Sequence, residues 1–220
     1  MELGANAWVT FRHEIYTLLA IGHANHEITK TCLLALSEVQ LYLPLVVSAF
    51  TGFYASRHHA TNVGKMFRGV ENALPLNWLH VPIGYDARAS TGVVSGTEIQ
   101  RPMGQIKAAD KIPPSWNSSK RMDFELELGA IIGANTEMGA HITVAEADRM
   151  IFGYVLLNDW SARDIQAWEY QPLGPFQAKA FATTISPWIV SPLALAPFRK
   201  STPKRDVLLI YWNPGLCCLI

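Results

Sequence analysis

The sequence predicts a β-rich protein of mixed α and β structure, with a helix near its N-terminal end. Apolar residues recur at helical spacing over residues 5–21, and strand-like patterns occupy 123–132 and 151–157. The region from 51 to 122 is rich in Gly, Pro, Asn and Ser. Helical spacing marks one face of a helix, whereas short apolar runs between turn-forming residues are typical of strands and loops.

The first half of the chain contains the predicted helix and a segment whose structure stays open. The helix places Trp8, Phe11, Ile15 and Leu18 three or four residues apart. In the segment 31–50, the leucines before residue 37 suit a helix, while the apolar residues after it alternate as in a strand. From 51 to 122 we expect short strands and long loops rather than helices, with a strand entering a turn at 93–97.

Composition excludes several classes of function. The chain has 220 residues, 50% of them hydrophobic, and a formal net charge of zero. No basic stripe predicts nucleic-acid binding, and no apolar stretch predicts a membrane span. The three cysteines, Cys32, Cys217 and Cys218, form no disulfide framework, and the first residues lack a signal peptide. We therefore expect a cytoplasmic protein.

The second half has clearer signals. Asp123–Ile132 is expected to be a strand, and Ile151–Leu157 a second, more fully buried one. Thr143 is expected to cap a short helix over 144–150, with Glu146 completing a capping box. Residues 161–170 are expected to form a short helix or helical turn.

Acidic residues alternate along the first of these strands. On a strand, Glu125 and Glu127 share one face, while Phe124, Leu126 and Leu128 share the other. One interpretation is a half-buried strand with a solvated acidic face. The other is that both glutamates converge on a hard cation, because calcium and magnesium take oxygen ligands.

Polar residues directly after the second strand allow similar alternatives. Asp159 places a carboxylate at the end of a buried strand, where it could serve a site, or Asn158 or Asp159 could cap the next helical turn. Arg163, Gln166 and Tyr170 share one helical face, which could clamp an anion or carbonyl or could simply be solvated.

Two other polar positions are candidates for chemistry. A histidine in the expected loop around His58 and His59 could be a general base, although most such histidines are plain surface residues. Lys179, in an apolar neighbourhood with Thr183 nearby, needs a partner that a carboxylate cluster would supply.

Read together, these segments resemble the fumarylacetoacetase (fumarylacetoacetate hydrolase) family. The resemblance is firm from about 51 to 198, fainter before 51 and absent after 198. The matching stretches are Phe53–Gly64, Met66–Arg68, Asn77–Tyr85, Val94–Thr97, Arg101–Gln105, Met122–Glu127, Leu157–Gln166, Trp168–Phe176 and Thr183–Trp188.

The resemblance implies a mixed β-roll that is incomplete and follows an N-terminal helix. It divides the chain into a helix and connecting strand at 1–50, a partial catalytic domain at 51–198 and a divergent tail at 199–220. The family's N-terminal barrel domain and the C-terminal part of its roll are expected to be absent, so the chain looks truncated at both ends. The family forms homodimers.

The resemblance also implies a reaction: hydrolysis of 4-fumarylacetoacetate to fumarate and acetoacetate, in tyrosine and phenylalanine breakdown, with Ca²⁺ and Mg²⁺. His59 would activate water, while Arg163, Gln166 and Lys179 would offset charge on the leaving group. Substrate would contact Tyr54, Arg68, Tyr85, Gln166 and Tyr170. Metal would be held by Glu125, Glu127 and Asp159, with Asp159, Lys179 and Thr183 at a second, magnesium-associated position.

Several departures from the family pattern bear on these roles. Gly52 replaces an aspartate that would be a fourth carboxylate ligand. The acidic residue that orients the histidine belongs to the missing C-terminal part, so His59 is expected to rotate without an acidic partner. The alternatives are a catalytically impaired isoform with a partial metal site, a related 2-oxo acid hydrolase or decarboxylase, and a non-enzymatic calcium module.

Overall fold

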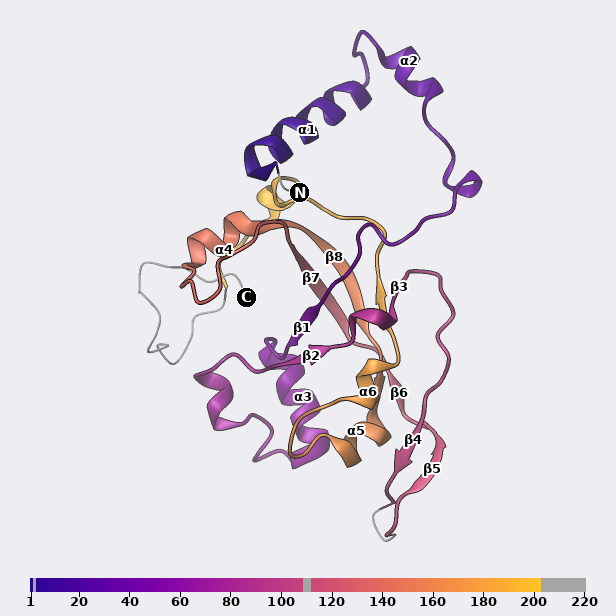
Figure 1. Cartoon of the computed structure of the whole chain (residues 1–220), viewed down its shortest axis with the longest axis vertical. Coiled ribbons are helices and arrows are strands. Elements are labelled where there is room, and N and C mark those ends of the chain that lie inside the picture. The colour runs from indigo at the N-terminus through magenta and orange to yellow at the C-terminus, as the bar shows by residue number, and fades with distance from the viewer. Residues whose placement is uncertain (2, 109–111, 203–220) are drawn as a thin grey trace.

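A computed structural model of the chain describes residues 1, 3–108 and 112–202, which form small sheets with helices beside them (Figure 1). This confirms the predicted α+β class, and the described sheets do not close into a barrel. The helices are α1 Gly4–Leu19, α2 His26–Thr31, α3 Arg57–Arg68, α4 Val144–Met150, α5 Arg163–Glu169, α6 Gln177–Ala180 and α7 Pro192–Leu195. The strands are β1 Phe50–Phe53, β2 Gly84–Ala87, β3 Gly92–Val94, β4 Met103–Ile106, β5 Ser115–Ser118, β6 Met122–Asp123, β7 Leu126–Ile132, β8 Ile151–Asp159, β9 Ser161–Ala162 and β10 Thr183–Ile185.

One four-stranded sheet organises the second half of the chain, in the order β3-β10-β8-β7. β10 runs parallel to β3 and antiparallel to β8, and β8 runs antiparallel to β7. The remaining strands form the pairs β1-β2, β4-β5 and β6-β9. The pairing of β8 with both β7 and β10 brings the end of β8 beside the start of β7 and beside Thr183.

The single strand predicted over Asp123–Ile132 is interrupted at 124–125. Side chains capture the backbone N–H groups there: Asp123 Oδ1 accepts from Phe124 N at 2.9 Å, and Asn158 Oδ1 accepts from Glu125 N at 3.1 Å. Such side-chain bonds compete with a strand ladder. As a result β6 pairs with β9, and β7 pairs with β8.

The expectation of strands and loops throughout 51–122 is wrong at α3, a twelve-residue helix. Ser56 begins it as a cap whose side chain accepts from His59 N at 3.3 Å. Ala60, Val63 and Gly64 form its buried face, at the three- and four-residue spacing of a helix. A β-carbon on Gly64 would lie 1.7 Å from Ala73 O, so this glycine permits close packing. The glycine and polar residues of the segment concealed the helical pattern.

The first helix is confirmed as α1, although it buries no residue. Trp8 meets Phe152 edge-on, with ring centroids 5.1 Å apart, and Arg12 Nε donates to Ser191 Oγ at 2.9 Å. Beyond it, the segment left open at 31–50 is neither one helix nor one strand, since only a 3₁₀ turn at Leu36–Glu38 follows α2 before β1. Among the described helices, none is both long and apolar enough to cross a bilayer.

The predicted capping box at α4 is confirmed. Thr143 Oγ1 accepts from Glu146 N at 3.3 Å, and Glu146 Oε2 accepts from Thr143 N at 2.8 Å. The prediction that Asn158 or Asp159 caps the next helix is wrong, because α5 begins after Ala162 and has no side-chain cap. Of the tail expected at 199–220, residues 203–220 lie outside the described residues, and Cys217 and Cys218 with them.

Small residues join α5 and α6 into a core next to the sheet. Ala162, Ile165 and Ala178 are almost fully buried, and Ile106, Met122 and Phe181 pack against them. Because two of the three buried residues are alanines, the backbones approach closely. This core sets the positions of the side chains that α5 and α6 direct at the sheet.

Candidate active site

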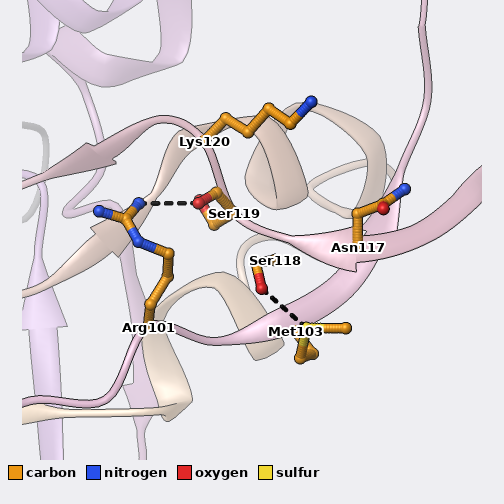
Figure 2. A pocket seen from close by; sticks show the side chains of 6 residues that line it. All are labelled: Arg101, Met103, Asn117, Ser118, Ser119 and Lys120. Atoms are coloured by element: carbon orange, nitrogen blue, oxygen red, sulfur yellow. Dashed lines mark hydrogen bonds between the residues drawn. The ribbon is translucent and has the colours of Figure 1, made fainter.

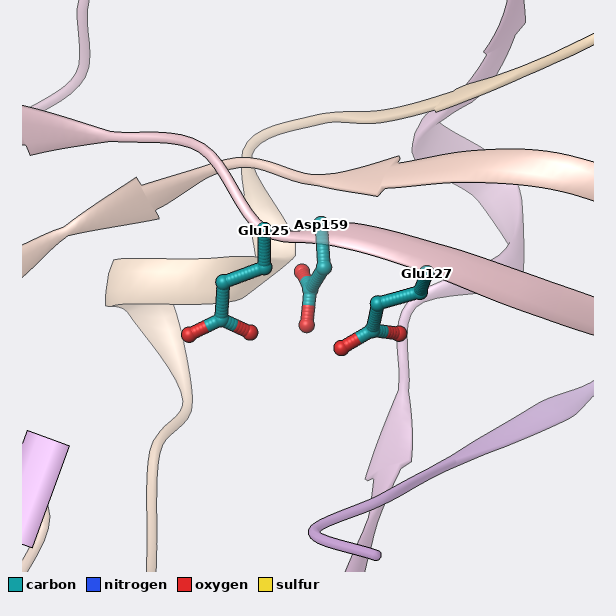
Figure 3. A group of neighbouring side chains, drawn as sticks. All are labelled: Glu125, Glu127 and Asp159. Atoms are coloured by element: carbon teal, nitrogen blue, oxygen red, sulfur yellow. The ribbon is translucent and has the colours of Figure 1, made fainter. Parts of the chain in front are cut away.

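Three carboxylates converge where β7 begins and β8 ends. Glu125 precedes β7, Glu127 lies within it, and Asp159 ends β8. One oxygen from each lies within 4.8 Å of the others, and Figure 3 shows all three side chains projecting to the same side of the strands. Glu125 is 9% exposed and Asp159 3% exposed. The acidic face is therefore turned inward, so the interpretation of a solvated acidic face is wrong.

Two cations neutralise part of this charge. Lys179 Nζ lies 2.6 Å from Glu125 Oε2 and 2.9 Å from Asp159 Oδ2, which gives this buried lysine the carboxylate partners it needs. Arg163 Nη2 lies 2.5 Å from Glu125 Oε1. Each oxygen of Glu125 is therefore held by a different cation, which offsets much of the cost of burying its charge.

His59 lies beside the same carboxylate. Its Nε2 is 3.3 Å from Glu125 Oε1, and its ring stands edge-on to Tyr54 at 5.5 Å between centroids. The expectation that His59 rotates without an acidic partner is therefore wrong, since Glu125 provides one from within the described chain. This contact explains how a histidine on α3 is aimed at the acidic cluster.

The electrostatics separate the three carboxylates. Burial, together with the negative charges of Asp159 and Glu125, raises the pKa of Glu127 to about 7. Burial also raises the pKa of Asp159, against the opposing charge of Lys179. Burial acts in the same sense on Glu125, but hydrogen bonds from His59 and Lys179 outweigh it and hold the pKa of Glu125 well below its usual range. The cluster thus holds one firmly ionised carboxylate beside one that protonates near neutrality.

Tyr85 closes the cluster from the β1-β2 pair. Its hydroxyl donates to Asp159 Oδ2, and burial raises the pKa of this phenol above its ordinary value, so it stays a neutral donor. Tyr85 lies directly across from Gly52. A β-carbon on Gly52 would lie 2.8 Å from Tyr85 Cε1, so the glycine provides the space that this ring occupies.

The other residues singled out in the sequence lie around this centre. Gln166 Oε1 accepts from Arg163 Nη1 at 2.9 Å, and Thr183 is buried opposite Asp159 in the β8-β10 register. Tyr54 Oη donates to Ala60 O at 3.0 Å. Arg68 donates through Nε to Asn72 O at 3.1 Å and through Nη2 to Ala73 O at 2.8 Å. The Tyr170 ring packs on the Phe67 ring, with 5.3 Å between their centroids. None of these contacts joins Arg68 or Tyr170 to the three carboxylates.

Sequence reasoning missed three residues that support this centre. Asp123 Oδ2 accepts from Arg163 Nε at 2.9 Å, and its position on the face of Glu125 could have identified it. Asp164 Oδ1 accepts from the buried Ser119 hydroxyl at 2.6 Å. The Glu169 carboxylate accepts three backbone N–H groups. The last two contacts depend on the tertiary structure, and no local pattern signals them.

A separate hollow of about 570 Å³ lies along β4 and β5. Figure 2 shows Arg101 turned to the Ser119 carbonyl, to which its Nη1 donates at 2.7 Å, whereas the ends of the Lys120 and Asn117 side chains lie away from that contact. Its polar groups do not converge on a point, so the acidic cluster is the better candidate for chemistry.

Comparison with known proteins agrees with this location. The family model described as fumarylacetoacetate (FAA) hydrolase C-terminal matches residues 48–204, which include every member of the cluster. Fumarylacetoacetase from Bos taurus is 50% identical over 210 residues, covering 94% of this chain and 50% of the relative. Its counterpart from Caenorhabditis elegans is 51% identical over 211 residues, with the same coverage. The chain spans about half the length of the curated relatives it matches.

Solved structures are more distant. A 5-carboxymethyl-2-hydroxymuconate delta-isomerase from Mycobacterium smegmatis is 24% identical with a TM-score of 0.47, covering 71% of this chain and 51% of that one. A fumarylpyruvate hydrolase from Pseudomonas aeruginosa, solved with Mn²⁺ and pyruvate, is 22% identical with a TM-score of 0.35, covering 50% and 42%. The family assignment rests on the family model, whose match extends over most of the chain. The chain belongs to the fumarylacetoacetate hydrolase family.

Proposed function

We propose that this chain hydrolyses the carbon–carbon bond of 4-fumarylacetoacetate, giving fumarate and acetoacetate. The observation behind this proposal is the convergence of Glu125, Glu127 and Asp159 beside His59, which joins hard oxygen ligands to a potential base. Its relatives that are named fumarylacetoacetase, with 50% and 51% sequence identity, support the same substrate.

The charges of the cluster fit a divalent cation. Four carboxylates, those of Asp123, Glu125, Glu127 and Asp159, face the two cations Arg163 and Lys179. This leaves two negative charges unbalanced, and their repulsion adds to burial in raising the pKa of Glu127. Three carboxylates are typical of calcium and magnesium sites.

We assign Ca²⁺ to the three converging carboxylates. Glu127 and Asp159 Oδ1 are the better donors, because both oxygens of Glu125 accept from cations and Asp159 Oδ2 accepts from Lys179 and Tyr85. When bound, the cation would act as a Lewis acid on the diketone oxygens. We place Mg²⁺ at a second position next to Asp159, Lys179 and Thr183, where Lys179 would contribute its backbone carbonyl.

His59 is proposed as the base. Water loses a proton to the imidazole as its oxygen bonds to the fumaroyl carbonyl carbon, and the bond from that carbon to the acetoacetate carbon then breaks. The electron pair leaves with the acetoacetate fragment, which takes up a proton. The Glu125 contact at 3.3 Å orients the ring for the first transfer.

The remaining residues bind and neutralise. Arg163, Gln166 and Lys179 provide donors for charge that develops on the leaving group, which is a large source of rate enhancement when the donors are fixed in advance. Tyr54 and Tyr85 flank the cluster and are proposed to contact substrate, with Gln166. Arg68 and Tyr170 are proposed to bind a substrate carboxylate, as a guanidinium and a phenol commonly do.

We further propose that the protein works as a homodimer in the cytoplasm, with a small acidic diketone as its partner and neither nucleic acid nor membrane involved. The low cysteine content supports a reducing compartment such as the cytoplasm, and the balanced charge argues against nucleic acid as a partner.

The decisive experiment measures hydrolysis of 4-fumarylacetoacetate by the purified chain, with calcium and with chelator. We compare it with a Glu125→Ala, Glu127→Ala double variant and with a control, Glu98→Ala, Glu137→Ala, that removes two exposed glutamates. Calcium-dependent turnover that only the first variant abolishes would support the proposal. Folded protein that binds calcium without turnover would overturn it in favour of the impaired isoform or the calcium module.

A further inference from the structure

The end of α5 carries a side chain that neither the reaction nor the metal site uses. Glu169, the last residue of α5, directs its carboxylate at the start of α6. Its Oε1 accepts from Phe176 N at 2.7 Å and from Ala178 N at 2.9 Å, and its Oε2 accepts from Gln177 N at 3.1 Å. Three consecutive backbone N–H groups are thus bound by one carboxylate.

These bonds matter because α6 is only four residues long. A single turn is below the length at which a helix is stable by itself, and its first N–H groups have no partners within the helix. A carboxylate at this end satisfies them and also interacts favourably with the helix dipole. The conformation of α6 therefore depends on Glu169.

α6 in turn determines where Lys179 lies. Lys179 is 5% exposed, and its Nζ lies between Glu125 Oε2 and Asp159 Oδ2. The other cation on Glu125, Arg163, is the first residue of α5. One end of α5 thus contacts Glu125 directly, while the other end reaches the same carboxylate through α6.

We infer that Glu169 is a positioning residue that holds α6 in the conformation needed to place the Lys179 ammonium between Glu125 and Asp159. The consequence for catalysis rests on the proposed function, but the placement of Lys179 does not. Removal of the carboxylate frees the start of α6, so the lysine leaves the cluster and becomes accessible to solvent.

The first test measures modification of Lys179 by an amine-reactive reagent, followed by mass spectrometry, in metal-free protein. We expect Glu169→Ala to raise the rate about 10-fold or more, since local opening exposes a protected group. Glu169→Gln, which keeps one acceptor oxygen, should give a smaller rise, and the exposed-site control Glu137→Ala none. Amide exchange in β7 and β8 should stay unchanged, which a general loss of structure would not permit.

Protection of Lys179 at the wild-type rate in folded Glu169→Ala would overturn the inference. If that variant does not fold, Glu169→Gln decides by the same criterion: faster labelling of Lys179 supports the inference and unchanged labelling refutes it.

The second test measures calcium affinity and turnover. Loss of a positive charge next to the carboxylates should tighten calcium binding at least about 5-fold, while turnover falls about 10-fold or more because a donor is misplaced. A purely structural defect would weaken both. In Lys179→Met protein, adding Glu169→Ala should change neither calcium affinity nor turnover further, since both substitutions act through the Lys179 ammonium. Additive effects of the two substitutions would refute the inference. Absence of calcium binding in the wild type would instead count against the proposed function.

Discussion

Replacing Glu127 by glutamine should make the metal-free protein more stable at alkaline pH, although it removes a proposed metal ligand. The pKa of Glu127 is raised because burial and the charges of Asp159 and Glu125 oppose its ionisation. At pH above that pKa the folded protein must hold the charge at a cost, whereas the unfolded chain ionises freely. Glutamine has nearly the same shape and no charge, so the cost disappears.

The magnitude follows from the displacement of the pKa. A rise from 4.5 to about 7 corresponds to about 3.4 kcal/mol at 1.36 kcal/mol per pH unit. Because the Glu127 side chain is partly solvated, we discount this to about 2 kcal/mol. The folded state binds the proton more tightly than the unfolded state does. The contribution of protonated Glu127 to the free energy of unfolding is therefore complete below pH 4.5 and is lost as the pH rises through about 7.

The assay is urea denaturation of both proteins in chelator, at about pH 5 and about pH 8. The difference in unfolding free energy should favour Glu127→Gln by about 2 kcal/mol at the higher pH and by well under 1 kcal/mol at the lower. Saturating calcium should reverse the order, because only the wild type retains the ligand. A difference that does not change with pH, or a glutamine variant that is less stable at about pH 8 in chelator, would refute the reasoning.

Three further perturbations test other parts of the structure. Thr143→Ala should destabilise the protein by about 1 kcal/mol, since it removes the cap that Glu146 completes; thermal denaturation against Thr143→Ser checks this. Gly52→Ala should lower the free energy of unfolding by about 1–3 kcal/mol, because the added methyl group meets the Tyr85 ring. Urea denaturation measures this change, and an unchanged midpoint would count against the placement of the ring. His59→Gln should lower turnover about 10²- to 10⁴-fold while calcium affinity stays within about 3-fold; a large loss of affinity would mean that the histidine is a ligand.

Local signals predicted several elements correctly because the relevant interactions are close in sequence. The capping box needs only Thr143 and Glu146, three residues apart, so it could be read directly. The helix at 57–68 was missed for the opposite reason: its buried face contains Gly64, whose suitability depends on packing against Ala73. Its capping residue, Ser56, was the one local sign of a helix start.

The site was predicted only in part. The family motifs identified Glu125, Glu127 and Asp159, and the structure brings these three together. The partners that hold them were not evident, because Glu169 acts on backbone groups of another helix and Asp123 acts through a residue forty positions away.

The sequence by itself determined that the acidic and apolar residues at 124–128 lie on opposite faces, since side chains alternate along an extended chain. Only the tertiary structure decided which face is buried. Hydrophobicity alone favours burying the leucines, yet Leu126 and Leu128 are 73% and 62% exposed while Glu125 is 9% exposed. The acidic face can be buried because α5 and α6 bring Arg163 and Lys179 to it from about forty and fifty residues further along the chain.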